Sequence, residues 1–414
     1  MKKIFSCIIG LVFSFNICHS QVLNKGYSFN DKSKESIIIP FEMILNLVII
    51  ELKINDSDPL SFILDSGLST MLITELGPND SLQLNFAKEM NLKGLGEGEA
   101  IKALHSYGNT IRLKGITGSN QDIFLTLENE FNLSEKLGRR IHGIIGYDVF
   151  NNFIITIDYE KELLFFYTKE SFNPELHAKS SLELPIEVID FKSYIHSTIE
   201  QYNGKKVNVR LLIDTGASHS LWLDVHHNNK INIPDRNIYS YLGTGLSGNI
   251  FGYYGRIQGM KLGTYNLAEV VVAYPDSASI YHANNLHIRN GSVGANVFRR
   301  FRLTVDYPNE RIFLKPNKHF KSPFDYNIVG IEISAPFEGI NYYIVTHVRK
   351  DSPAQKAGIM IDDELIKVGY SYVRELEVNE MAEILNNKRG KNVPFIVKRN
   401  GEKIKIKLNL TPEI

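Results

Sequence analysis

The chain has 414 residues, and its 46 basic and 46 acidic side chains give a formal net charge of zero at pH 7. This balance lacks the basic excess that marks nucleic-acid-binding proteins, so no nucleic-acid partner is expected. The two cysteines, Cys7 and Cys18, both lie close to the N-terminus.

Residues 1–20 are typical of a secretory signal peptide. Lys2 and Lys3 precede an apolar run that ends at Ile17, and cleavage is expected after Ser20. The run is short for a membrane span, so we expect no span after cleavage and an exported protein, in the periplasm or outside the cell. The mature chain would contain no cysteine, which excludes disulfides and a thiol nucleophile. The alternative is a lipoprotein signal lipidated at Cys18, which the residues before that cysteine disfavour.

An internal duplication organises most of the chain. Segments 52–73 and 199–223 each read as an apolar strand, a polar turn, a second apolar strand and then Asp-Ser/Thr-Gly. Their aspartates, Asp65 and Asp214, are 149 positions apart. Segments that begin at His142 and Asn290 repeat a second pattern 148 positions apart, with a glycine and an Asp-Tyr pair in matching places. We therefore predict one β-rich lobe used twice, over residues 35–170 and 171–322.

Two carboxylates held close together can serve as general base and general acid in peptide hydrolysis. They cannot both ionise cheaply, so they share one proton and titrate as a pair. Asp65 and Asp214 are the expected pair, at the bottom of a cleft between the lobes. Hydroxyls of Ser66 and Thr215 would hold the two loops, and Gly67 and Gly216 would let the backbones approach. One Asp-Ser/Thr-Gly arises about 0.2 times by chance in a chain of this length, whereas two in duplicated blocks are a strong signal.

The strings FILDSG (62–67) and LLIDTG (211–216), with the later IIG (144–146) and SVG (292–294), resemble the pepsin and retropepsin clan of aspartic peptidases. The resemblance implies a mainly β fold, with two homologous β-barrel lobes around a central cleft. It also implies an aspartic endopeptidase that acts on polypeptides and uses neither a metal nor an organic cofactor. Leu68 and Ser292 depart from the usual pattern of the family.

The family closes its cleft with a β-hairpin flap. Glycine-rich segments 94–113 and 243–257 stand in the corresponding places, and Tyr253 and Tyr254 are candidate flap aromatics above the substrate. The string GTGLSG (243–248) fits a dinucleotide-binding fingerprint, but strand-like residues follow it where that motif requires a helix.

Residues 325–414 resemble a PDZ domain of bacterial exported proteases, through SPAQKAGI (352–359) and the following DDELIKVG. Such domains add an extended peptide to a sheet edge. The resemblance implies a carboxylate-binding loop at Val329, Gly330 and Ile331, a docking strand that includes Ile333, and a helix at 378–387 as the other wall. Whether this domain binds polypeptide ends or only packs on the lobes stays open.

Two further hypotheses remain beside the peptidase. Leu68 and Ser292 would suit a catalytically inactive peptide-binding protein, and a site built across two chains is a third arrangement that the duplication makes unnecessary. His219, Asp224, His226 and His227 could suggest a metal, but adjacent histidines on an extended segment point to opposite faces. No metal site is expected there.

Overall fold

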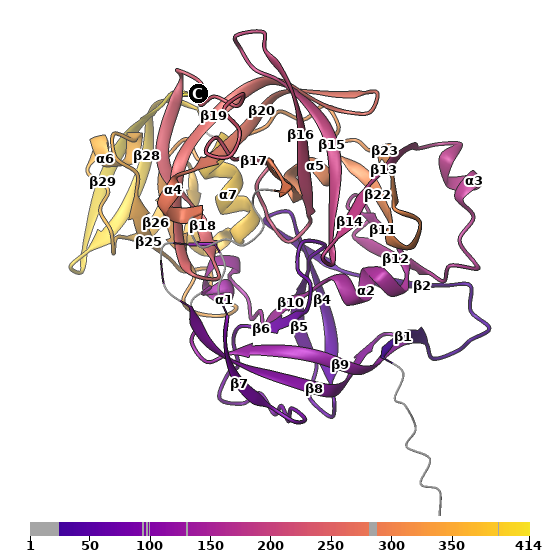
Figure 1. The fold of residues 1–414 in the computed structure, drawn as a ribbon. Coiled ribbons are helices and arrows are strands. Elements are labelled where there is room, and N and C mark those ends of the chain that lie inside the picture. The colour runs from indigo at the N-terminus through magenta and orange to yellow at the C-terminus, as the bar shows by residue number, and fades with distance from the viewer. Residues whose placement is uncertain are drawn as a thin grey trace, which may run out of the picture.

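The computed structural model describes residues 25–92, 95, 96, 98, 100–129, 131–280, 288–387 and 389–414. The predicted signal peptide, which includes Cys18, lies outside these residues. The described chain is mainly β and forms two lobes and a C-terminal domain, as predicted (Figure 1). None of its described helices has the length and apolarity that a membrane span requires.

Lobe 1 is a sheet closed into a barrel. Its strands follow the order β1-β9-β6-β10-β5-β4-β8-β7, and an additional pairing of β8 with β9 closes a ring of six. Strand β5 is buried along its whole length, which explains why all its residues except Ser61 are apolar. The strands are β1 (Gly26–Phe29), β3 (Glu42–Ile44), β4 (Leu47–Ile54), β5 (Leu60–Leu64), β6 (Met71–Ile73), β7 (Lys88–Leu92), β8 (Ile101–Leu113), β9 (Ile116–Thr126) and β10 (Gly143–Ile145).

Lobe 2 repeats this barrel. Its strands follow the order β14-β15-β16-β21-β17-β20-β19-β18, and the pairing of β15 with β19 closes the ring. The predicted hairpins β4–β5 and β15–β16 both form, around Asn55-Asp56 and Asn203-Gly204. The strands are β14 (Glu187–Ile189), β15 (Lys192–Glu200), β16 (Lys206–Asp214), β17 (Leu221–Leu223), β18 (Asn237–Gly245), β19 (Gly248–Leu262), β20 (Tyr265–Pro275) and β21 (Gly291–Gly294).

A third sheet joins the lobes. It has the order β13-β23-β22-β11-β12-β2, and its central pair, β11 and β22, brings one strand from each lobe together. At this junction the hydroxyls of Thr156 and Thr304, 148 positions apart, lie 2.7 Å from each other. The strands are β2 (Ser36–Pro40), β11 (Ile154–Asp158), β12 (Leu163–Tyr167), β13 (Leu182–Pro185), β22 (Phe301–Asp306) and β23 (Arg311–Pro316).

Short helices connect the strands of the lobes. They are α1 (Leu133–Leu137), α2 (Tyr147–Asn152), α3 (Pro174–Ala178), α4 (Ser277–Ile280), α5 (Ala295–Phe298) and the 3₁₀ helix η2 (Tyr307–Asn309). The segment that follows β23, residues 317–324, is ordered around Arg300, whose side chain is fully buried. The Arg300 guanidinium donates to the carbonyls of His319, Ser322 and Pro323 and lies 3.6 Å from the centre of the Phe324 ring.

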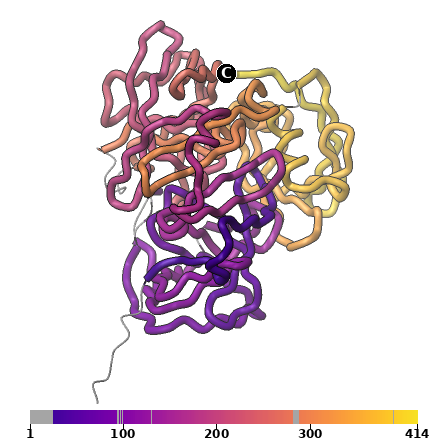
Figure 2. Tube along the Cα trace, turned by 90° about the vertical axis from the view of Figure 1, so that its right-hand side faces the viewer, coloured from indigo at the N-terminus to yellow at the C-terminus, as the bar shows by residue number. Residues whose placement is uncertain are grey.

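The C-terminal domain is a smaller sheet of order β24-β25-β26-β28-β29 that packs with helix α7 beside both lobes (Figure 2). Helix α7 covers the residues predicted to be helical, and its buried face includes Met381 and Leu385. The elements are β24 (Ile331–Ser334), β25 (Tyr343–Val348), α6 (Pro353–Ala357), β26 (Glu364–Val368), β27 (Ser371–Tyr372), η3 (Val373–Glu375), α7 (Val378–Asn387), β28 (Gly390–Arg399) and β29 (Glu402–Leu410).

Candidate active site

Two equivalent strand ends deliver the paired aspartates. Asp65 follows β5 directly, and Asp214 is the last residue of β16. Strand β10 runs parallel to β5, and β21 runs parallel to β16, so the predicted glycine elements cross behind both loops. A Cβ atom at Gly146 or Gly294 would lie 2.2 Å from a backbone oxygen of the adjacent loop, which explains the need for glycine.

A reciprocal set of hydrogen bonds locks the two loops together. The Ser66 amide donates to the Thr215 hydroxyl at 3.0 Å, and the Thr215 amide donates to the Ser66 hydroxyl at 3.1 Å. Each hydroxyl then donates across the interface, from Ser66 to the Ile213 carbonyl at 2.8 Å and from Thr215 to the Leu64 carbonyl at 3.1 Å. Both side chains are fully buried, so this arrangement fixes each loop against the other lobe.

The carboxyl groups of Asp65 and Asp214 lie next to each other at the centre of this arrangement, since a Cβ on Gly67 would lie 3.2 Å from Oδ1 of Asp65 and 3.3 Å from Oδ1 of Asp214. Oδ1 of Asp65 also accepts from the Gly67 amide at 2.6 Å and from the Gly216 amide at 3.3 Å. The lobes meet so closely here that a Cβ on Gly216 would lie 2.3 Å from Cγ of Asp65. The predicted pair and its four supporting residues are therefore brought together.

Burial and mutual repulsion keep a proton on this pair. Burial raises the pKa of Asp65, although the two glycine amides oppose the shift. Burial and the neighbouring Asp65 charge raise the pKa of Asp214 to about 8, against the opposing charges of Arg289 and Lys192. Asp65, with two amide donors, is the better-stabilised anion, and Asp214 is the group that holds the proton at neutral pH.

The two departures from the family pattern leave this geometry intact. The Leu68 carbonyl accepts from the Tyr147 amide at 2.8 Å, which ties the first loop to α2. The Ser292 hydroxyl lies 3.1 Å from Nε2 of His219. Neither side chain separates the aspartates.

Three supporting side chains were missed by the sequence reasoning. The Tyr307 hydroxyl, in lobe 2, donates to the Ser66 carbonyl at 3.1 Å and lies 2.6 Å from the Ser193 hydroxyl. Lys192 and Arg289 place two positive charges near the aspartates. The duplicated Asp-Tyr pair contained a signal for Tyr307, but the lobe 1 equivalent, Tyr159, has a buried hydroxyl without a partner in the structure as described.

Both lobes carry a flap, and the flap tips are bonded to each other. The Ser247 amide, at the tip between β18 and β19, donates to the Leu95 carbonyl at 2.8 Å, and its carbonyl accepts from Gly98 at 2.6 Å. Tyr253 and Tyr254 lie further along β19. Tyr253 packs against Tyr239, with ring centres 5.1 Å apart. Burial and, to a lesser extent, the charge of Glu332 in the C-terminal domain raise the pKa of Tyr254.

The comparisons with protein families agree with this geometry. Residues 50–149 and 198–296 match the aspartyl protease family model, one match in each lobe. Residues 330–410 match the PDZ domain model. The chain has two aspartyl protease-like domains followed by a PDZ domain. No curated protein matches the sequence significantly.

The loop predicted to bind a peptide carboxylate makes hydrogen bonds within the PDZ domain. The Val329 amide donates to the Leu385 carbonyl at 3.3 Å, and the Gly330 amide donates to Oδ1 of Asn327 at 2.8 Å. Val329 and Ile331 are buried, and Ile333 on β24 is partly buried. The residues predicted to bind a peptide end therefore lie together, but two of their amides already have partners within the domain.

Lobe 1 contacts the PDZ domain where β24 ends and α7 begins, beside the predicted peptide-binding residues. The Glu135 carbonyl accepts from the Ala335 amide at 2.7 Å, and its carboxylate accepts from the Ser334 hydroxyl at 2.9 Å. A Cβ on Gly138 would lie 3.7 Å from Cβ of both Ala335 and Val378, so this glycine sits between the end of β24 and the start of α7.

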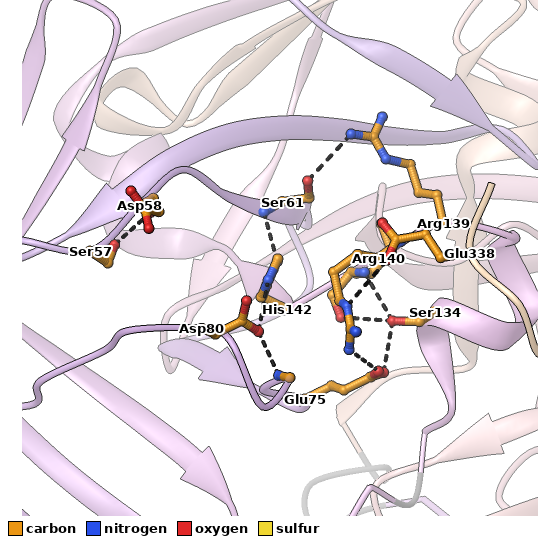
Figure 3. A network of polar contacts seen from close by, with 12 residues as sticks. Ser57, Asp58, Ser61, Glu75, Asp80, Ser134, Arg139, Arg140, His142 and Glu338 are labelled. Atoms are coloured by element: carbon orange, nitrogen blue, oxygen red, sulfur yellow. Dashed lines mark hydrogen bonds and ion pairs between the residues drawn. The ribbon is translucent and has the colours of Figure 1, made fainter.

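A polar network behind this contact continues into lobe 1 (Figure 3). Arg140 bonds Glu75 at 2.8 Å and lies 3.7 Å from Glu338 of the PDZ domain. His142 accepts from the Ser61 amide at 2.9 Å and faces Asp80 at 3.3 Å. On the other side of α1, Lys136 donates to the Thr244 hydroxyl in the lobe 2 flap at 2.5 Å. The protease flap, lobe 1 and the PDZ domain are thus connected.

The histidines of lobe 2 between residues 219 and 227 contact side chains close to them in the sequence. Nδ1 of His227 lies 2.6 Å from the Asp224 carboxylate, which also accepts from the amides of His226 and His227. The ring of His219 instead stacks on Trp222, with centres 5.2 Å apart.

Proposed function

We propose that the protein is an aspartic endopeptidase that hydrolyses polypeptides with Asp65 and Asp214. The observation that carries this proposal is the adjacent pair of buried carboxyl groups, held across two lobes by the reciprocal bonds of Ser66 and Thr215. A pair that shares one proton supplies a base and an acid in the same place.

In the proposed reaction, the ionised Asp65 takes a proton from a water molecule placed between the two carboxyl groups. The water attacks the scissile carbonyl, while the protonated Asp214 donates its proton to the carbonyl oxygen. Asp65 then gives its proton to the leaving amine nitrogen as the C–N bond breaks, and Asp214 takes back a proton from a hydroxyl of the tetrahedral intermediate, which restores the pair. Substrate entry requires separation of the flap tips, because the Leu95–Ser247 bonds cross the cleft.

The alternative, an inactive peptide-binding protein, was motivated by Leu68 and Ser292. Loss of activity in such a fold would call for a displaced or unpaired carboxylate. The aspartates are instead paired, and both departing residues make their contacts away from the two carboxyl groups. The geometry therefore favours the enzyme.

The proposal includes export and a peptide-binding role for the PDZ domain. Cleavage after Ser20 would place the enzyme in the periplasm or outside the cell. The PDZ groove would receive a polypeptide end after lobe 1 withdraws from its contact with the domain. Mass determination of the mature N-terminus tests the first of these statements.

The decisive experiment is digestion of a diverse peptide mixture from pH 3 to 8 by the mature protein and by its Asp65→Asn and Asp214→Asn variants. We expect cleavage by the wild type and at least a thousandfold loss in both variants, on the scale seen when a catalytic acid or base is removed. Peptide binding without cleavage by the wild type at every pH would instead support the inactive binding protein.

A further inference from the structure

A chain of three hydrogen bonds ends on the Asp65 carboxylate. The Ser193 hydroxyl lies 2.6 Å from the Tyr307 hydroxyl, which donates to the Ser66 carbonyl at 3.1 Å. That carbonyl belongs to the same peptide unit as the Gly67 amide, which donates to Oδ1 of Asp65 at 2.6 Å. Two side chains of lobe 2 therefore reach the aspartate of lobe 1 through a single peptide group.

The protons of this chain all point toward the aspartate. A carbonyl oxygen accepts and cannot donate, so the phenol proton of Tyr307 is directed to Ser66. The phenol oxygen is then free to accept from Ser193, whose hydroxyl supplies the proton of the first bond. Both lobe 2 side chains are buried, and burial raises the pKa of Tyr307, so the phenol stays a donor at acidic and neutral pH. Each bond polarises the next, which strengthens donation to an ionised carboxylate more than to a neutral carboxyl group.

The equivalent tyrosine of lobe 1 makes no such connection. Tyr159 and Tyr307 each follow the last residue of a central strand of the shared sheet, β11 or β22, in the duplicated Asp-Tyr pair. Both side chains have 3% of their surface exposed, yet the Tyr159 hydroxyl has no hydrogen-bond partner in the part of the chain that the structure describes. The two tyrosines therefore differ in what surrounds their hydroxyls and not in their burial.

The first donor of the chain is also specific to lobe 2. The hairpins β3–β4 and β14–β15 share a two-residue turn with positive φ angles, at residues 45–46 and 190–191. Counted from these turns, Ser193 corresponds to Val48, whose side chain cannot donate a proton. The duplicated fold thus carries unequal supports for two equivalent aspartates.

The charges around the pair do not explain why Asp65 would be the ionised member. Lys192 opposes the raised pKa of both aspartates, and Arg289 opposes that of Asp214, so these charges alone would favour ionisation of Asp214. Selection of Asp65 therefore depends on the hydrogen bonds that its carboxylate accepts. The charged and titratable groups that face the pair or the chain of bonds are Asp214 on β16, Lys192 on β15, Arg289 before β21, Tyr147 on α2 and Tyr307 on η2.

We propose that Tyr307 and Ser193 are positioning residues that make Asp65, and not Asp214, the ionised member of the catalytic pair. Their hydrogen bonds orient the peptide unit between Ser66 and Gly67 so that its N–H points at the carboxylate. This inference rests on the proposed endopeptidase function and assigns the role of base within it.

The pH profile of kcat/KM tests the proposal. Its acid limb reports formation of the singly ionised pair, which Tyr307→Phe should make less stable. We expect that limb to move up by about half a pH unit or more, which is about a threefold loss of kcat/KM below it. The base limb reports loss of the second proton, and Asp65 is ionised before and after that step, so this limb should stay in place. Ser193→Ala removes only the first donor and should move the acid limb in the same direction by less.

Tyr159→Phe is the matched control. It makes the same substitution at the equivalent and equally buried position, where the hydroxyl has no partner among the described residues, so the acid limb should not move. Thermal unfolding of each variant records damage to the fold separately. If Tyr307→Phe lowers Tm or kcat/KM at every pH and leaves the acid limb in place, Tyr307 supports only the fold and the proposal is overturned. If Tyr307→Phe does not fold, an unmoved acid limb in Ser193→Ala overturns it instead.

Direct titration separates failure of this inference from failure of the proposed function. The aspartate carboxyl carbons are labelled with ¹³C, and the Asp65 signal is identified by its absence in Asp65→Asn. Its titration is followed by NMR in the wild type, Tyr307→Phe and Tyr159→Phe. A higher pKa of Asp65 in Tyr307→Phe alone would support the proposal even if the wild type cleaves nothing. Cleavage by the wild type, with an Asp65 titration that Tyr307→Phe does not change, would reject the proposal and leave the endopeptidase assignment intact.

Discussion

The reciprocal bonds between Ser66 and Thr215 predict how strongly the two lobes depend on one hydroxyl. Ser66→Ala removes a bond to the Ile213 carbonyl and a bond from the Thr215 amide. The Thr215 amide then stays buried without that acceptor. Two lost hydrogen bonds of about 1 kcal/mol each, with an added penalty for the orphaned donor, give a loss of about 2–4 kcal/mol in the free energy of unfolding.

This loss should be visible in both stability and activity. An entropy of unfolding of about 2 cal/mol/K per residue turns the predicted loss into a decrease of roughly 2–5 °C in Tm for a chain of this size. Because the same hydroxyl aligns the aspartate loops, kcat/KM should fall by about a hundredfold, the scale expected from a small misplacement of catalytic groups. Differential scanning calorimetry and peptide cleavage measure the two effects.

Two control variants separate alignment from stability. Ser66→Thr keeps the hydroxyl, as in the equivalent position of lobe 2, and should retain most of the activity. Ser57→Ala removes another buried hydroxyl of lobe 1, which accepts from the Ile54 amide at 3.0 Å far from the site, and should lower Tm without a comparable loss of kcat/KM. If Ser66→Ala reduces kcat/KM no more than Ser57→Ala does, the bonds do not align the catalytic pair.

Three further predictions concern the pair and the PDZ groove. Gly216→Ala should abolish cleavage, because its Cβ would lie 2.3 Å from Cγ of Asp65; measurable cleavage would show that the loops can move apart. Asp214→Asn should raise Tm relative to the wild type at pH 8 but not at pH 4. In the folded protein the pKa of Asp214 is raised to about 8, so the carboxyl group keeps its proton at pH 4 and loses it as the pH rises, which destabilises the wild type. Asn does not titrate, so an equal Tm difference at both pH values would contradict this expectation. Asn379→Ala removes two hydrogen bonds of 2.8 Å from α7 to lobe 1 and should increase the affinity for a free C-terminal peptide about tenfold, measured by fluorescence anisotropy. Unchanged affinity would show that lobe 1 does not restrict the groove.

The repeat in the sequence predicted the features that depend on local pattern. Strand ends carry Asp65 and Asp214 because apolar runs precede them, and glycines stand behind both loops because the backbone passes too closely for a side chain. Helix 378–387 was predicted within its observed bounds, since it combines an apolar face with strong helix formers. These features need only short stretches of sequence.

Features that depend on contacts between distant segments were not predictable in the same way. Tyr254 was predicted as a flap residue from its place after a glycine-rich tip, and nothing in the sequence indicated that the Glu332 charge of the PDZ domain would add to the effect of burial in raising its pKa. Arg289 joins the site only because β21 returns to β16 after a long excursion. The basic segment 315–323 gave no sign in the sequence that its carbonyls would accept hydrogen bonds from Arg300.

Strand β1 shows the same limit at the start of lobe 1. Residues 26–29 precede the predicted lobe boundary at residue 35, but they pair with β9 and extend the lobe 1 sheet. The segment is short and mixed in polarity, so its own sequence does not indicate a strand partner about ninety residues away.

The sheet shared by both lobes also constrains how the protein can be made. Strand β11 pairs with β22, whose residues are synthesised almost 150 positions later. Until then, the nascent first half ends in an open strand edge that could pair with another chain. Native contacts this distant in sequence also slow folding. The edge of β11 therefore stays unpaired until β22 has been synthesised. During that interval the protein is most exposed to aggregation or to exchange of strands between two copies.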